Sequence, residues 1–156
     1  MKLAVCICNS NNNRFRRWLT LPDSNYRLNE IIEQLCRNQE DRCIIVDYRT
    51  TLKIENIVDY DIFYLNELIL KLNSCATYNE IQALTETYST SLEDIVQKVK
   101  NGGYRFYDNK TLMQLAEEFA QTDNYQQNDE FDIYKMVNEL ERTGYEQTSK
   151  GVICFN

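Results

Sequence analysis

The stretch from Ile54 to Leu72 limits what this chain can fold into more than any other part of the sequence. From Ile62 onward its apolar residues recur at spacings of three and four, which predicts a helix. Leu68 and Leu70 add apolar surface on other sides of that helix. A helix that is apolar on several sides is normally buried. We therefore expect this stretch to be the hub on which the rest of the chain packs.

Turn and capping signals divide the remaining sequence into strands and short helices. Thr77-x-x-Glu80, Thr90-x-x-Glu93 and Thr111-x-x-Gln114 are capping-box patterns that predict helix starts. The predicted strands are 3–8, which is expected to be central in its sheet, 15–20, 43–48, 104–107, 145–148 and 152–155. The predicted helices are 24–37, three within 61–100, one that begins at 111 and one over 130–142. This order predicts an α+β fold with a mixed unit (1–60), a helical middle (61–103) and a second mixed unit (104–156).

Composition removes several function classes. The chain has no histidine, so the commonest general base and the commonest metal ligand are both missing. The six cysteines include no Cys-x-x-Cys pair, and most adjoin apolar residues. We interpret them as reduced thiols that pack as small apolar side chains, with zinc or a disulfide as the alternatives. No cofactor and no metal are expected.

No apolar run approaches the roughly 20 residues that a membrane-spanning helix needs. Met1-Lys2 is followed by only a short apolar run before the asparagines of 9–13, so no secretory leader is expected either. The expected location is therefore the cytoplasm, without a membrane partner.

The net charge of −7 is unevenly distributed. Residues 1–60 carry 9 basic and 8 acidic side chains, whereas residues 61–156 carry 8 basic and 16 acidic ones. An acidic surface repels nucleic acid and attracts basic protein surfaces. We therefore expect a basic protein partner and no direct contact with nucleic acid.

Other interpretations of the charged residues stay open. Acids along amphipathic helices are commonly just a solvated face. Tyr48, Tyr60, Tyr64 and Tyr78 either contact a partner or complete the edge of the core. The Arg14–Trp18 segment interleaves arginines with aromatic residues, a pattern that can bind nucleic acid. A small metal-dependent nuclease or hydrolase could use the clusters Asp59-x-Asp61, Glu117-Glu118 and Asp129-Glu130-x-Asp132.

Short segments along nearly the whole chain resemble the ArdA antirestriction proteins of mobile genetic elements and phages. None of the segments is specific alone, and the resemblance rests on their order and spacing. They are Trp18–Pro22, Ile45–Tyr48, Leu65–Leu68, Ala83-Leu84, Ser91–Ile95, Leu115–Glu118, Phe131–Ile133, Asn138–Leu140 and Gly144.

The resemblance implies an elongated, three-part, non-catalytic inhibitor, usually dimeric. Its acidic surface would mimic bent duplex DNA and occupy the DNA-binding groove of a host type I restriction-modification enzyme. The acidic face would comprise Glu55, Asp59, Asp61, Glu67, Glu80, Glu86, Glu93, Asp94, Glu117 and Glu118. Self-association would use Met136, Val137, Asn138 and Leu140, although Val137-Asn138 replaces the glycine-arginine pair of the family.

The amount of charge leaves the target of such an inhibitor open. Duplex DNA carries one negative charge per ~1.7 Å, so two chains of −7 each would match only about 24 Å of duplex. Another nucleic-acid-binding defence complex, such as a CRISPR effector, is therefore the alternative target.

Overall fold

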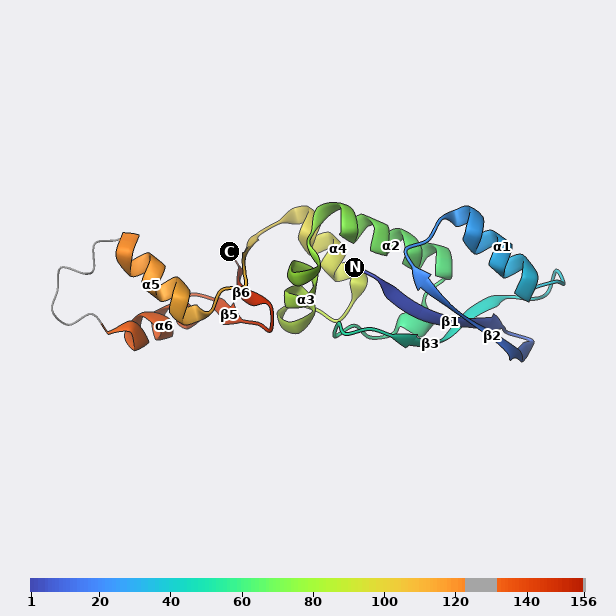
Figure 1. The fold of residues 1–156 in the computed structure, drawn as a ribbon, viewed down its shortest axis with the longest axis horizontal. Coiled ribbons are helices and arrows are strands. Elements are labelled where there is room, and N and C mark those ends of the chain that lie inside the picture. Colours follow the sequence, from blue (N-terminus) through green and yellow to red (C-terminus); the bar gives the residue numbers. More distant parts are fainter. Residues whose placement is uncertain (123–131, 156) are drawn as a thin grey trace.

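The computed structural model describes residues 1–122 and 132–155. In these residues the chain forms six α-helices and two three-stranded antiparallel sheets, which confirms the α+β class. The molecule is elongated, with the first sheet at one end, α5 and α6 at the other, and α2 to α4 between them (Figure 1). No helix in the described part of the chain is long and apolar enough to cross a membrane.

The first sheet has the strand order β2-β1-β3, with all neighbours antiparallel. Its central strand is nearly continuous in apolar residues and is buried at six of its seven positions. This confirms the predicted central position. The strands are β1 (Leu3–Asn9), β2 (Asn12–Leu21) and β3 (Cys43–Arg49).

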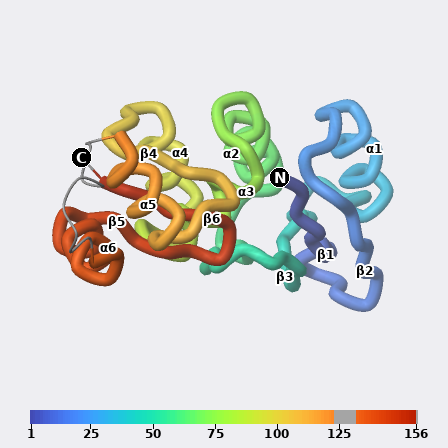
Figure 2. The backbone as a smooth tube through the Cα atoms, turned by 60° about the vertical axis from the view of Figure 1, so that its left-hand side comes forward, coloured from blue at the N-terminus to red at the C-terminus, as the bar shows by residue number. Residues whose placement is uncertain are grey.

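Two helices cover only one face of this sheet. α1 (Asn25–Leu35) begins after Ser24, whose hydroxyl accepts a hydrogen bond from the backbone N–H of Arg27. α1 and α2 lie on the same side of the sheet (Figures 1 and 2). Alternate residues of β1 point toward them and join the main core, whereas none of the described helices lies over the opposite face.

The predicted hub helix is α2 (Ile62–Cys75), and it starts later than the apolar stretch does. Asp61 caps it by accepting hydrogen bonds from the backbone N–H groups of Phe63 and Tyr64. The preceding residues form a single 3-10 turn, η1 (Ile57–Asp59), in which Ile57 is fully buried. The hub is therefore confirmed, with one exception: Leu70 is half exposed.

Two further helices complete the middle of the molecule, α3 (Tyr78–Thr87) and α4 (Leu92–Asn101). The capping box of Thr77 and Glu80 is present at the start of α3, as predicted. The predicted box that starts at Thr90 is wrong. Ser91 caps α4 instead, because its hydroxyl accepts a hydrogen bond from the backbone N–H of Asp94.

The second sheet has the order β4-β6-β5 and lies between two groups of helices. On β6, Ile153 belongs to the main core with α2 to α4, whereas the adjacent Val152 belongs to a second apolar cluster with α5 and α6. Successive side chains of a strand point to opposite faces, so both faces of this sheet are buried. The elements are β4 (Tyr104–Asp108), α5 (Leu112–Thr122), α6 (Ile133–Arg142), β5 (Tyr145–Gln147) and β6 (Gly151–Phe155).

The three predicted units share apolar packing. The main core runs from Leu3 in β1 to Val96 in α4 and also includes Ile153 of β6. Thr111 and Gln114 form the predicted capping box before α5. The predicted helix over 130–142 begins at Ile133 in the structure, and Glu130 lies outside the described residues.

Candidate functional site

Three of the ten predicted carboxylates meet at one cleft in the middle of the molecule. Asp59, Asp61 and Glu93 line it together with Tyr60 and Tyr64, and it has a volume of about 320 Å³. Asp59 ends η1, Asp61 caps α2, and Glu93 lies in the first turn of α4. We call this site the acidic tyrosine cleft. It also includes Asn56, whose backbone is left-handed at φ 58°.

The two tyrosines of the cleft have different roles. Tyr60 is half-buried, and its hydroxyl donates a hydrogen bond to Glu93. Burial raises the pKa of Tyr60, and the hydrogen bond to Glu93 raises it further. Tyr64 is exposed and stacks on Tyr60 with ring centroids 6.2 Å apart. The cleft thus presents an aromatic wall beside three carboxylates.

The remaining predicted acids do not join this cleft. Glu55 and Asp94 are exposed, and Asp94 accepts a hydrogen bond from the hydroxyl of Ser89. Glu67 lies on the exposed side of α2, whereas Glu117 and Glu118 lie on α5 toward the far end of the molecule (Figure 1). The ten acids therefore extend along the molecule from η1 to α5.

Two of the predicted acids hold the middle helices to the second sheet. Glu86 of α3 accepts hydrogen bonds from the backbone N–H (2.8 Å) and the hydroxyl (2.5 Å) of Ser149 in the β5–β6 turn. Burial alone would raise the pKa of Glu86, but the hydrogen bonds from Ser149 and Gln82 outweigh it and keep the pKa below its ordinary value. Glu80 accepts a hydrogen bond from the hydroxyl of Tyr104 at 2.5 Å.

Few of these charges are neutralised by a neighbouring cation. Among the described residues, only Glu67, paired with Lys71, and Glu118, paired with Lys110, form ion pairs within the set of ten. Hydrogen bonds from uncharged donors leave a carboxylate its charge. The other eight acids form no ion pair within the described residues, and five of them, Asp61, Glu80, Glu86, Glu93 and Asp94, accept hydrogen bonds from within the chain.

The four candidate self-association residues lie on α6, and most of them face inward. Leu140 is buried in the second apolar cluster, and Met136 and Val137 are half-buried against that cluster. Asn138 is exposed. The sequence pattern alone does not separate residues that pack within α6's own cluster from residues that face a second chain, and self-association stays a prediction.

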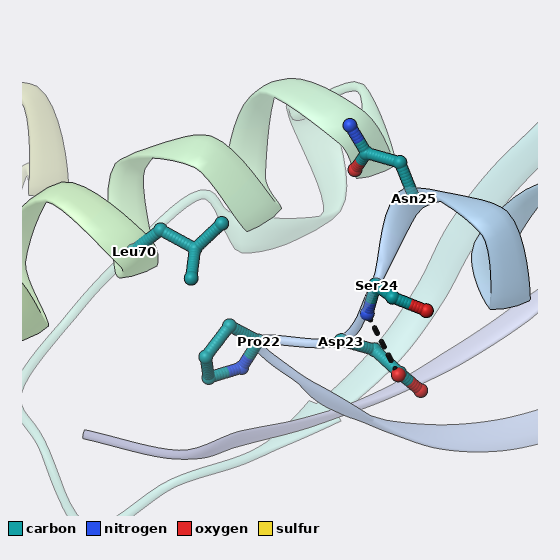
Figure 3. A pocket seen from close by; sticks show the side chains of 5 residues that line it. All are labelled: Pro22, Asp23, Ser24, Asn25 and Leu70. Atoms are coloured by element: carbon teal, nitrogen blue, oxygen red, sulfur yellow. Dashed lines mark hydrogen bonds between the residues drawn. The ribbon is translucent and has the colours of Figure 1, made fainter.

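A larger groove, of about 510 Å³, lies elsewhere, at the start of α1 (Figure 3). Leu70 of α2 and Pro22 face each other across it, and the carboxylate of Asp23 accepts a hydrogen bond from the backbone N–H of Ser24. Asp23 also pairs with Arg27 at 3.4 Å. None of the predicted acids lines this groove, and sequence reasoning did not single it out.

The alternative of a metal-dependent enzyme would need acidic side chains that come together around one point. Within 1–122 and 132–155, no three histidine, cysteine or acidic side chains are grouped closely enough to hold a metal ion. Asp129 and Glu130 of the third predicted cluster lie outside the described residues.

No protein-family model matches the sequence, and no curated protein matches it.

Sequence reasoning grouped Asp59 with Asp61 but did not join Glu93 to them. The local sequence signal for this cleft is the triplet Asp59-Tyr60-Asp61, in which an aromatic residue stands between two acids. Glu93 joins the triplet only because the start of α4 packs beside η1 and α2. That contact depends on the tertiary fold, so it cannot be recognised from the spacing of residues in the sequence.

Proposed function

We propose that this protein is a non-catalytic antirestriction protein that mimics DNA. Its acidic surface would occupy the DNA-binding groove of a host type I restriction-modification enzyme in the bacterial cytoplasm. The observation that carries the proposal is the series of eight carboxylates, on elements along an elongated molecule, that form no ion pair within residues 1–122 and 132–155. A DNA-binding groove is lined by lysine and arginine, so such a series offers it the charge of a phosphate backbone.

The acidic tyrosine cleft adds a specific feature to this proposal. A cation near an aromatic face and beside carboxylates is stabilised by both. The exposed ring of Tyr64 and the carboxylates of Asp59 and Asp61 would therefore suit one arginine or lysine side chain of the groove. This contact would fix the register of the inhibitor, while the other acids supply long-range attraction.

The test is a DNA-cleavage assay with a purified type I restriction-modification enzyme. The informative variant combines Asp59→Asn, Asp61→Asn and Glu93→Gln. Each replacement keeps a side-chain oxygen, so the cap of α2 and the acceptor for Tyr60 survive while three charges are lost. We expect the concentration for half-inhibition to rise roughly tenfold, at about 0.5 kcal/mol per lost charge.

The matched control removes three exposed acids from the first unit, by Glu30→Gln, Glu33→Gln and Glu40→Gln. It changes the net charge equally and should leave inhibition within about twofold of the unchanged protein. Equal losses of inhibition in the two variants would show that the cleft contributes only its negative charge and makes no specific contact. A parallel assay on a CRISPR effector identifies the target, and inhibition of neither enzyme by the folded protein would overturn the proposal.

A further inference from the structure

The uncovered face of the first sheet gathers cationic and aromatic side chains. The strand register places Trp18 opposite Cys6 and Arg16 opposite Cys8 on the β2 side, and Arg49 opposite Ala4 on the β3 side. All of these residues alternate with those that enter the main core. We call this surface the open sheet face, and its other members are Thr20, Ile44 and Asp47.

The long side chains of this face lie over its middle strand. The guanidinium carbon of Arg49 is 4.5 Å from the ring centroid of Trp18, and the two residues are on opposite edge strands, so this pair spans β1. Cys6 and Cys8 beneath are almost fully buried, although no helix in residues 1–122 or 132–155 lies over them. Trp18 itself remains 41% exposed. The face is therefore an ordered aromatic and cationic platform open to solvent.

The alternation of β2 divides the arginine-rich segment between two faces. Arg16 and Trp18 lie on the open sheet face, whereas Phe15 and Arg17 line a groove beside α1, where Arg17 donates a hydrogen bond to Gln34. Sequence alone showed only that bases and aromatics are interleaved. Each face therefore receives one arginine and one aromatic ring of this segment, and the open sheet face is the one on which a second arginine, Arg49, lies against the aromatic ring.

We propose that the open sheet face binds single-stranded nucleic acid. Charge complementarity argues for this occupant, because Arg16 and Arg49 are cationic and Asp47 is the one acid that the register places beside them. Unpaired bases stack on exposed aromatic rings, and arginines beside the ring can bind the phosphates of the same strand. A duplex hides its base faces, so Trp18 would distinguish a single strand from a double strand.

The acidic remainder of the molecule does not prevent this binding. The expectation of no direct contact with nucleic acid rested on net charge, whereas the open sheet face lies at the end of the molecule opposite α5 and α6 (Figure 1). At physiological ionic strength, charges separated by more than about 8 Å of solvent are largely screened from each other. This inference is independent of the proposed antirestriction function.

Fluorescence gives a direct test, because Trp18 is the single tryptophan of the chain. Titration with a 20-nucleotide oligothymidylate should quench its emission to saturation, and a duplex of the same length should quench it much less. With two arginine contacts, log affinity should fall against log salt concentration with a slope of about −1.4. Equal quenching by duplex, or no quenching by the oligothymidylate, would overturn the proposal.

Two pairs of variants locate the binding, measured by anisotropy of a labelled oligothymidylate. Arg16→Gln with Arg49→Gln should weaken binding at least tenfold and flatten the salt slope. The matched control, Arg17→Gln with Arg37→Gln, removes the same charge from the groove beside α1 and should change binding less than twofold. Equal effects of the two pairs would contradict the assignment to this face.

Trp18→Ala should weaken binding roughly 5- to 100-fold, and Trp18→Phe should restore most of it. Circular dichroism of each variant checks that it is folded. If the tryptophan emission of the protein alone shifts with protein concentration, a second copy covers the face, and the proposal fails.

Discussion

The two sheets of this protein have the same number of strands but opposite environments. The first sheet has helices on one face, and its other face carries Arg16, Trp18 and Arg49 in solvent. The second sheet lies between α3 and α4 on one side and α5 and α6 on the other, so Val152 and Ile153 are both fully buried. A sheet with one open face can serve as a binding surface, whereas a sheet covered on both faces holds the molecule together.

This difference predicts that substitutions in the second sheet change stability and that substitutions on the open sheet face change binding. The largest effect should come from Ile153→Ala, because Ile153 joins β6 to the main core. Truncation of a buried isoleucine leaves a cavity, and we expect a loss of about 2–5 kcal/mol in the free energy of unfolding. Urea unfolding measures it. A loss below about 1 kcal/mol would show that the second sheet is not part of the main core.

Gly151 allows a second test at the start of β6. A Cβ atom at this position would lie 2.2 Å from the carbonyl oxygen of Tyr107, so the backbones of β4 and β6 would have to separate. We expect Gly151→Ala to cost about 1–3 kcal/mol, as overpacking does. Gly102→Ala is the control, because Gly102 also has a positive φ but its Cβ would meet nothing within 4 Å. Thermal unfolding should rank Gly151→Ala as the more destabilising.

Glu86→Gln tests the link between α3 and the β5–β6 turn. The pKa of Glu86 lies below its ordinary value of 4.5, so its contribution to stability is present above pH 4.5 and is lost as the pH falls through the lowered pKa. The substitution should cost about 1–2 kcal/mol at pH 7, since charged acceptors make the stronger hydrogen bonds. The variant should also lose less stability between pH 5 and pH 3. An unchanged acid profile would contradict this role.

The smallest effect on stability should come from the open sheet face. Trp18→Ala removes a partly exposed ring and its contact with Arg49, and we expect a loss below about 1 kcal/mol. Urea unfolding beside Ile153→Ala gives the direct comparison. A loss as large as that of Ile153→Ala would mean that the two sheets do not differ as described.

The sequence predicted the elements well because their signals are local. Thr77 and Thr111 cap helices where the patterns indicated, and each predicted strand is present within a few residues. The prediction of a cap at Thr90 was wrong because Ser91 follows it directly, also has a hydroxyl, and is the residue that caps α4. The carbonyl of Thr90 accepts a hydrogen bond from the backbone N–H of Glu55. Adjacent hydroxyl residues give the same pattern, and only tertiary contacts select between them.

The candidate sites depend on contacts that the sequence does not encode locally. Glu93 lines the same cleft as Asp59 and Asp61 because the start of α4 lies near η1 and α2, and Arg49 reaches Trp18 across β1. Sequence reasoning could name the acids and the arginines. It could not tell which of them share a surface, because that depends on the order of strands in the sheet and on which faces the helices cover.

The central claim is that the acidic surface competes with DNA for a basic groove. The most direct measurement is the binding of this protein to a purified type I restriction-modification enzyme, in competition with a labelled duplex and over a series of salt concentrations. The account predicts displacement of the duplex and an affinity that falls as salt rises. Binding that is independent of salt, or a complex in which the enzyme holds duplex and protein together, would contradict it.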